Sequence, residues 1–336
     1  GDPTLVELHT NNINLAAQYG NPLTRWQSGV TVLLEKIPGN TNLAKLRAIC
    51  LLEADYNWWL KVIFAKRMIS RMHNHGIMPI EQGATRGKTT MDTALLKQLF
   101  FDQANILHEN CSISSTDAET CYDAVNHTIS SLCLQAMCVS IFLVQCYLVC
   151  IQTMQYYLQT GFGQANTGYG GTSSQRSMGL VQGSGGAPAT WTAVSTALVD
   201  TYKRKGYGAS LYAGYNKSNL DVAALLYVDD TDLLHKPALP QATEDEIADY
   251  TQRATYYWAK LLQATGGNLK AMKCYWYLLS YKFHKGTATL KSLHELPRYT
   301  LHIPQQEGDD VEIELKDNHT ATQVFGIWSS PKSTDA

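Results

Sequence analysis

The chain has 336 residues, a formal net charge of −2, 45% apolar residues and 17% charged residues. This composition is that of a folded protein with one large or two ordinary domains, and it excludes a disordered chain. The near-neutral total argues against a polyanion partner. The charges are uneven, however, because residues 1–100 hold eleven lysines and arginines against seven acids, whereas residues 101–239 hold ten acids and six bases. This division would suit a basic surface that binds phosphates and an acidic surface that binds metal ions. Charged surfaces that are merely exposed to solvent would give the same pattern.

The cysteines indicate the compartment. Eight are spread along the chain, with no CxxC pair and no Cys/His spacing that suits zinc. Several lie inside apolar runs, as free buried thiols do, so we expect a reducing, intracellular setting. No secretory signal is visible, and a chain that begins with Gly1 and ends on SSPKSTDA is expected to be a piece of a longer protein.

The first hundred residues predict helices and one loop. Apolar residues recur every three or four positions on both sides of the breaker Pro38-Gly39-Asn40, which predicts helices within 23–37 and 43–75. The basic loop GATRGKTT at 83–90 then opens a further helix at 91–107. This loop resembles half of a phosphate-binding loop but lacks the spacing of a Walker A motif.

The middle of the chain predicts a strand, a long helix and a loop. SISSTDAETCYDAV at 112–125 is short and β-prone, and the apolar run 132–151 approaches the length that spans a bilayer. Because Gln135 and Ser140 interrupt this run, and anchoring residues do not flank it on both sides, a helix buried in a large core is predicted. The glycine-rich and serine-rich segment 161–186 is expected to be a mobile or a substrate-facing loop.

The last third predicts two helices and several strands. Pro188 suits the start of a helix, and a second helix at 244–265 ends at Gly266 and Gly267. The tail from residue 274 onward alternates as antiparallel strands do.

The stretch LLYVDDTDLL at 225–234 places Asp229 and Asp230 between two apolar runs. A strand interior would force one carboxylate toward the core, so a tight hairpin with both acids at its turn is predicted. A metal ion would be their natural partner. Two metal ions in phosphoryl chemistry need a further acid from another strand, and Asp117 and Asp123 are the candidates.

The order of four motifs identifies a family. They are DAETCYD from residue 117, Gln182-Gly183 followed by Pro188, the YVDD sequence at 227–230, and Gly266-Gly267 followed by Lys273. In this order the sequence resembles the reverse transcriptase family, of the non-LTR retrotransposon type. The segments LLEKIPG, LRAICLLEADY, EQGATRGKTTMD and VFGIWSSP are similar to further segments of that family.

The resemblance implies a set of site residues. Asp117, Asp229 and Asp230 would be the catalytic triad that binds two Mg²⁺ ions, which Mn²⁺ could replace, and the backbone carbonyl of Ala118 would add an oxygen ligand. Tyr122 would be the steric gate that selects deoxynucleotides. Further contacts to the dNTP are implied for Gln182, Gly183, Lys273, Arg47 and Lys36.

The fold implied by the resemblance is α+β, a right-hand polymerase fold. Fingers at 1–100 would precede a palm at 101–290, whose antiparallel sheet is packed on helices and carries the triad. Strands at 291–336 would lead toward a thumb that is largely absent.

The implied function is that of the RNA-directed DNA polymerase domain of a retrotransposon, which adds dNTPs to a DNA primer on an RNA template, with no membrane partner. An alternative is a catalytically inactive, reverse transcriptase-like module that binds nucleic acid or protein. An RNA-dependent RNA polymerase is disfavoured by Tyr122 and by Tyr227-Val228 before the two acids.

Overall fold

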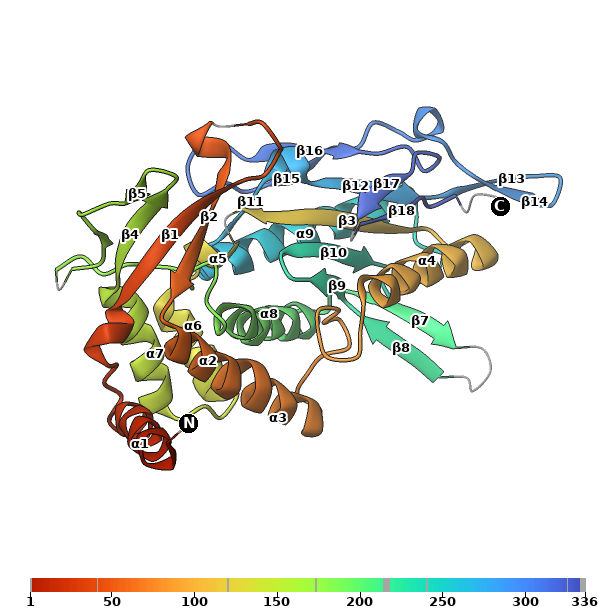
Figure 1. Cartoon of the computed structure of the whole chain (residues 1–336). Coiled ribbons are helices and arrows are strands. Elements are labelled where there is room, and N and C mark those ends of the chain that lie inside the picture. Colours follow the sequence, from red (N-terminus) through yellow and green to blue (C-terminus); the bar gives the residue numbers. More distant parts are fainter. Residues whose placement is uncertain are drawn as a thin grey trace. The chain divides into compact units, whose positions relative to one another are not determined.

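The computed structural model describes residues 2–40, 42–119, 121–172, 174–213, 218–239, 241–324 and 326–332, without the side chains of 44 and 213 (Figure 1). The chain forms two compact units. Unit 1 consists of Gly1–Met78 and Tyr122–Val194, and unit 2 of Pro79–Cys121 and Ser195–Ala336. Neither unit is one continuous segment. The division into fingers, palm and tail at residues 100 and 290 stays a prediction.

Unit 1 contains a sheet in which the strand order is β2-β1-β4-β5, with β6 beside β4. The helices predicted between residues 23 and 52 are wrong in large part, because β1 (Ser28–Glu35) and β2 (Leu46–Leu52) form an antiparallel pair. The β-branched run Val30-Thr31-Val32 explains the difference, since such side chains are stiff and favour a strand. The other strands are β4 (Gln155–Thr160), β5 (Gly163–Gln164) and β6 (Tyr169–Gly170).

Helices and an aromatic core complete unit 1. Trp26 is fully buried, and its ring lies 5.0 Å from that of Tyr56 and 5.7 Å from that of Trp59. The helix that carries Tyr56 and Trp59 continues through a π-helical stretch, which often marks a functional region. The helical elements of the N-terminal part are α1 (Pro3–Tyr19), η1 (Thr24–Gln27), α2 (Ala54–Leu60), the π-helical η3 (Lys61–Met68) and α3 (Ile69–Asn74).

The long apolar helix predicted at 132–151 is two helices. Short α5 (Cys121–Ala124) is followed by α6 (His127–Ala136) and α7 (Ile141–Thr153). Cys138 adopts a left-handed conformation with φ of +60°, which the α-helix does not continue through. In the described part of the chain, no helix has the length and apolar character to cross a membrane.

Unit 2 is built on a sheet in which the order is β15-β16-β12-β3-β10-β9, with β11 beside β3. The predicted β-prone segment forms β3 (Cys111–Glu119), and the predicted hairpin is β9 (Ala224–Tyr227) followed by β10 (Asp230–His235). The strands predicted for the tail are also present. They are β12 (Tyr275–Leu279), β13 (Tyr281–His284), β14 (Thr287–Leu290), β15 (Leu301–Ile303), β16 (Val311–Leu315), β17 (Thr322–Val324) and β18 (Ile327–Ser329). The VFGIWSSP segment spans β17 and β18, and its Phe325 lies outside the described residues.

Helices cover both faces of this sheet. The remaining elements of unit 2 are α4 (Thr90–Leu107), the C-terminal half of α8 (Ala187–Arg204), β7 (Ala209–Ala213), β8 (Ser218–Val222), α9 (Glu244–Ala264), β11 (Asn268–Leu269) and two short turns, η4 (Ala271–Lys273) and η5 (Leu293–Glu295). Phe100 and Phe101 of α4 pack with Ile113, Leu234 and Tyr277 in an apolar core. The structure thus contains both helices and strands, as expected for the predicted α+β class.

Helix α9 packs against the opposite face of the sheet (Figure 1). The contacts between them include hydroxyl groups. Ser112 and Ser114 of β3 hydrogen-bond Thr251 and Thr255 of α9, the second pair at 2.9 Å, and Nε2 of buried His235 lies 3.1 Å from Oγ of Ser114. The polar character of SISST therefore serves this interface, where each buried hydroxyl has a partner.

Candidate active site

The β9–β10 hairpin places the two adjacent carboxylates of the YVDD sequence at its turn. Val228 adopts φ of +61° between the strands, and Asp230 is the first residue of β10. Asp230 is opposite Tyr227 of β9 on one side and opposite Asp117 of β3 on the other. Two distant parts of the sequence thus bring carboxylates to one end of the sheet, as predicted for a pair from different strands.

The electrostatics of Asp230 show that negative charge accumulates there. Burial raises its pKa from the ordinary value of 3.8 to about 6, and repulsion from Asp229, Asp117 and Asp232 adds to the effect. Only Lys273 acts in the opposite sense among the causes of this shift. The site is therefore short of positive charge.

Lys273 lies beside the third carboxylate. Its Nζ donates a hydrogen bond to Oδ2 of Asp117 at 2.7 Å, and the backbone N–H of Lys270 donates to the Asp117 carbonyl at 2.9 Å. A cavity of about 350 Å³ opens over these groups. It is lined by Ser115, Thr116, Asp117, Asp230, Lys273 and Tyr275 and by Gln323, Val324 and Gly326 near the β17–β18 hairpin.

The donor set fits a hard divalent cation, although the side chains do not stand in a metal-holding arrangement. Among the described residues, no three His, Cys, Asp or Glu side chains are grouped as metal ligands. At this site, Lys273 hydrogen-bonds one oxygen of Asp117. Carboxylate oxygens and an excess of negative charge are nevertheless what Mg²⁺ prefers. Ala118 is buried and pairs with Leu269 of β11, so its backbone is fixed next to Asp117.

In unit 1, three of the residues predicted to contact the nucleotide line one cavity. Tyr122, Gln182 and Gly183 border a space of about 540 Å³, together with Lys61 and Lys66 of η3. Neither lysine was predicted as a site residue; the excess of basic residues in the first hundred positions was the available sequence signal. The lining of this cavity therefore includes an aromatic residue, a glycine and two lysines.

The turn that forms this cavity is held from two sides. The backbone N–H of Cys50 in β2 donates to the Gln182 carbonyl at 2.8 Å, and the N–H of Gly185 donates to Oδ1 of Asn57 at 2.6 Å. Gly183 has φ of +112°, and a Cβ there would lie 2.2 Å from the Cys50 carbonyl oxygen. Only glycine allows this close approach.

The two fingers residues predicted to clamp the triphosphate are placed differently. Arg47 lies in β2 opposite Leu34 of β1, and Lys36 directly follows β1. Both side chains are exposed, and neither is among the residues that line the cavity with Tyr122. Their predicted contact with a nucleotide stays a prediction.

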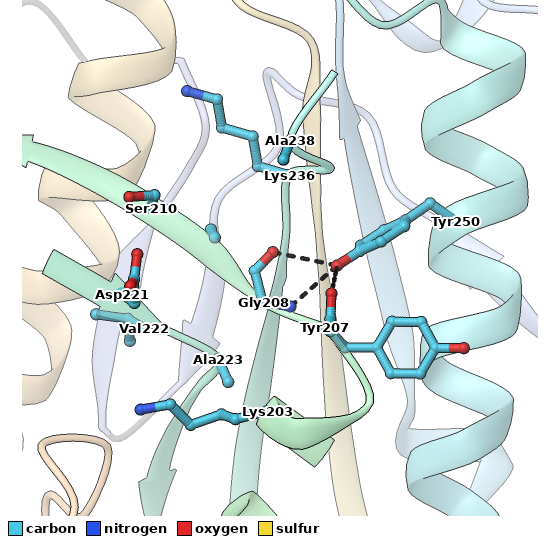
Figure 2. A pocket seen from close by; sticks show the side chains of 12 residues that line it. Lys203, Tyr207, Gly208, Ser210, Asp221, Val222, Ala223, Lys236, Ala238 and Tyr250 are labelled. Atoms are coloured by element: carbon cyan, nitrogen blue, oxygen red, sulfur yellow. Dashed lines mark hydrogen bonds between the residues drawn. The ribbon is translucent and has the colours of Figure 1, made fainter. Parts of the chain in front are cut away.

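A further hollow in unit 2, of about 340 Å³, contains none of the predicted site residues. Figure 2 shows Lys203 and Lys236 on opposite sides of it, and the hydroxyl group of Tyr250 at the backbone of Gly208. Both ammonium groups are already paired, Lys203 with Glu81 at 2.9 Å and Lys236 with Glu109. This hollow therefore offers no unpaired lysine to an anionic ligand.

Comparison with known families agrees with the motif order. A family model described as reverse transcriptase (RNA-dependent DNA polymerase) matches residues 37–294, well over half of the chain. The chain therefore belongs to the reverse transcriptase family. No curated protein sequence matches it.

Solved structures share the fold at low sequence identity. A telomerase from Candida tropicalis, in complex with a TWJ fragment of telomeric RNA, is 12% identical with a TM-score of 0.52, and the match covers 82% of this chain and 44% of that one. The apo telomerase from Candida tropicalis is also 12% identical, with a TM-score of 0.50, covering 86% and 51%. The chain thus spans about half the length of these neighbours, and the likeness shows the fold alone.

Proposed function

We propose that this chain is the RNA-directed DNA polymerase domain of a retrotransposon, with fingers and a palm, which adds dNTPs to the 3′-hydroxyl of a DNA primer on an RNA template. The register of Asp117 opposite Asp230, with Asp229 at the adjoining turn, carries the proposal. Family membership supports the polymerase class. The retrotransposon assignment rests on the order of the sequence motifs.

The carboxylates would hold two Mg²⁺ ions. When bound, such ions lower the pKa of an attacking hydroxyl and stabilise a leaving pyrophosphate. The protein's own part is positioning: β3 and the β9–β10 turn fix Asp117, Asp229 and Asp230 at one end of a sheet. Lys273 orients Asp117 and has an exposed ammonium group that suits a phosphate oxygen.

The cavity of unit 1 would accept the nucleotide. Its volume of about 540 Å³ suits a sugar and base, and the Tyr122 ring on its border would collide with a 2′-hydroxyl. Gly183 permits close backbone approach, and Lys61 and Lys66 supply positive charge. Arg47 and Lys36 would act on the triphosphate from the β1–β2 hairpin.

Primer extension tests this proposal. The wild-type chain is given an RNA template, a DNA primer, dNTPs and Mg²⁺ or Mn²⁺, beside Asp229→Asn and the control Asp221→Asn, an exposed carboxylate of β8. We expect extension by the wild type and the control and none by Asp229→Asn. A folded wild type that binds the primer and template but never extends it would contradict the proposal and favour the inactive binding module.

A further inference from the structure

A buried ion pair lies behind the carboxylates of the candidate active site. Nζ of Lys97 in α4 is 2.9 Å from Oδ2 of Asp232 in β10, and the two side chains are 2% and 0% exposed. Neither residue has a role in the proposed chemistry. Because burying two charges costs more in desolvation than many ion pairs return, an apolar pair would serve the fold at least as well.

The sheet register places the negative member of this pair on the same face as the carboxylates of the candidate active site. Asp232 follows Asp230 by two residues, so both side chains leave β10 on the same face. On β3, Asp232 is opposite Ser115, two residues before Asp117. Lys97 instead approaches from α4, where its ammonium group is 5.9 Å from the centre of the Phe101 ring.

The electrostatics agree with this direction. Asp232 is one of the carboxylates that raise the pKa of Asp230, after burial and the nearer acids Asp229 and Asp117.

We propose that Asp232 and Lys97 are positioning residues that strengthen divalent cation binding by Asp117, Asp229 and Asp230. Asp232 places a fourth carboxylate on the same face of the sheet as Asp117 and Asp230, and Lys97 makes its burial tolerable. The pair acts as a fixed dipole, negative toward the cation. This inference rests on the proposed function, because it needs the triad to bind metal.

Two double variants change the dipole while keeping the site filled. Lys97→Met/Asp232→Leu removes it, and Lys97→Glu/Asp232→Lys reverses it. We expect Mn²⁺ affinity to fall by roughly tenfold in the first and further in the second, since the first removes a carboxylate and the second puts an ammonium group in its place. The control Lys291→Met/Glu244→Leu removes another partly buried pair, located at the opposite end of α9 from β11.

The readout is Mn²⁺ binding to the whole chain by electron paramagnetic resonance, without nucleotide or nucleic acid, beside thermal unfolding of each variant. Asp229→Asn serves as the reference for loss of the site. The inference is supported if affinity falls in the order wild type, apolar pair, reversed pair, while the control binds like the wild type. If the reversed pair does not fold, the apolar pair and the control decide.

Two results would overturn it, and they differ. Equal Mn²⁺ affinity in the wild type and the folded pair variants, lost only in Asp229→Asn, overturns the inference and leaves the proposed function standing. Absence of saturable Mn²⁺ binding to the wild type overturns the inference together with the metal site of the proposed function.

Discussion

Nζ of Lys273 lies 2.7 Å from Oδ2 of Asp117, so without metal the protein supplies its own cation to one of the three carboxylates. The Lys273 side chain is 57% exposed and can leave without unpacking a core. This contact has two opposite consequences, one for metal binding and one for catalysis.

We expect Lys273→Gln to tighten Mn²⁺ binding in the absence of nucleotide by about threefold to tenfold, because a competing charge is removed. The same change should slow primer extension, since the ammonium group would no longer meet the triphosphate. Electron paramagnetic resonance and single-turnover extension measure the two effects. The neighbouring Lys270→Gln, whose partner Glu119 is 3.7 Å away, is the control and should change neither.

The raised pKa of Asp230 predicts a pH dependence of stability. A carboxyl group whose folded pKa is about 6, against 3.8 ordinarily, favours the folded state at low pH and loses that contribution as pH rises through 6. In a chelator, Asp230→Asn should therefore be more stable than the wild type at pH 7.5 by about 1–2 kcal/mol, and equal to it below pH 4. Urea unfolding at both pH values measures this. Equal stability at pH 7.5 would show that neither burial nor the neighbouring carboxylates penalise the ionised form of Asp230 in the folded state.

Tyr122 should control sugar selection. We expect Tyr122→Ala to raise the efficiency of ribonucleotide incorporation, relative to deoxynucleotides, by about tenfold or more, because the ring at the cavity border is removed. Tyr122→Phe keeps the ring and should discriminate like the wild type. The ratio of kcat/KM values for the two nucleotides is the measurement, and an unchanged ratio in the alanine variant would remove the gate from Tyr122.

Gly183→Ala should damage the nucleotide cavity. The added Cβ would lie 2.2 Å from the Cys50 carbonyl, and φ of +112° is unfavourable for alanine, so we expect a loss of about 2–3 kcal/mol in the free energy of unfolding and a raised KM for dNTP. Gly87→Ala has a positive φ of +83° but open space, and should lose only about 1 kcal/mol. Chemical denaturation compares the two variants.

The sequence was most informative where one motif fixed one geometry. Two adjacent acids between apolar runs predicted a hairpin with its turn at Asp229 and Asp230. Inside a strand, successive side chains alternate between the two faces, so one of the two carboxylates would have pointed into the core. Pro188 similarly predicted the start of α8, and Gly266, which has φ of +97°, predicted the end of α9.

Other features depend on contacts that no local pattern contains. The apolar spacing over β1 and β2 fits a helix as well as a strand, and only their pairing decides between the two. The ion pair of Lys97 and Asp232 joins residues 135 positions apart, and Lys61 reaches the cavity of Tyr122 only in the folded unit. Contacts between residues so far apart in the sequence can be identified only from the folded structure.

The hydrogen bonds between serine hydroxyl groups of β3 and threonine hydroxyl groups of α9 help to determine the register of β3 in the sheet. Ser112 and Ser114 face α9 while Ile113 faces the apolar core, and a slip of β3 by one residue would exchange these environments. That slip would also turn the Asp117 carboxylate to the wrong side of the sheet. Serines that contribute little hydrophobic burial thus favour the strand register in which Asp117 and Asp230 are neighbours.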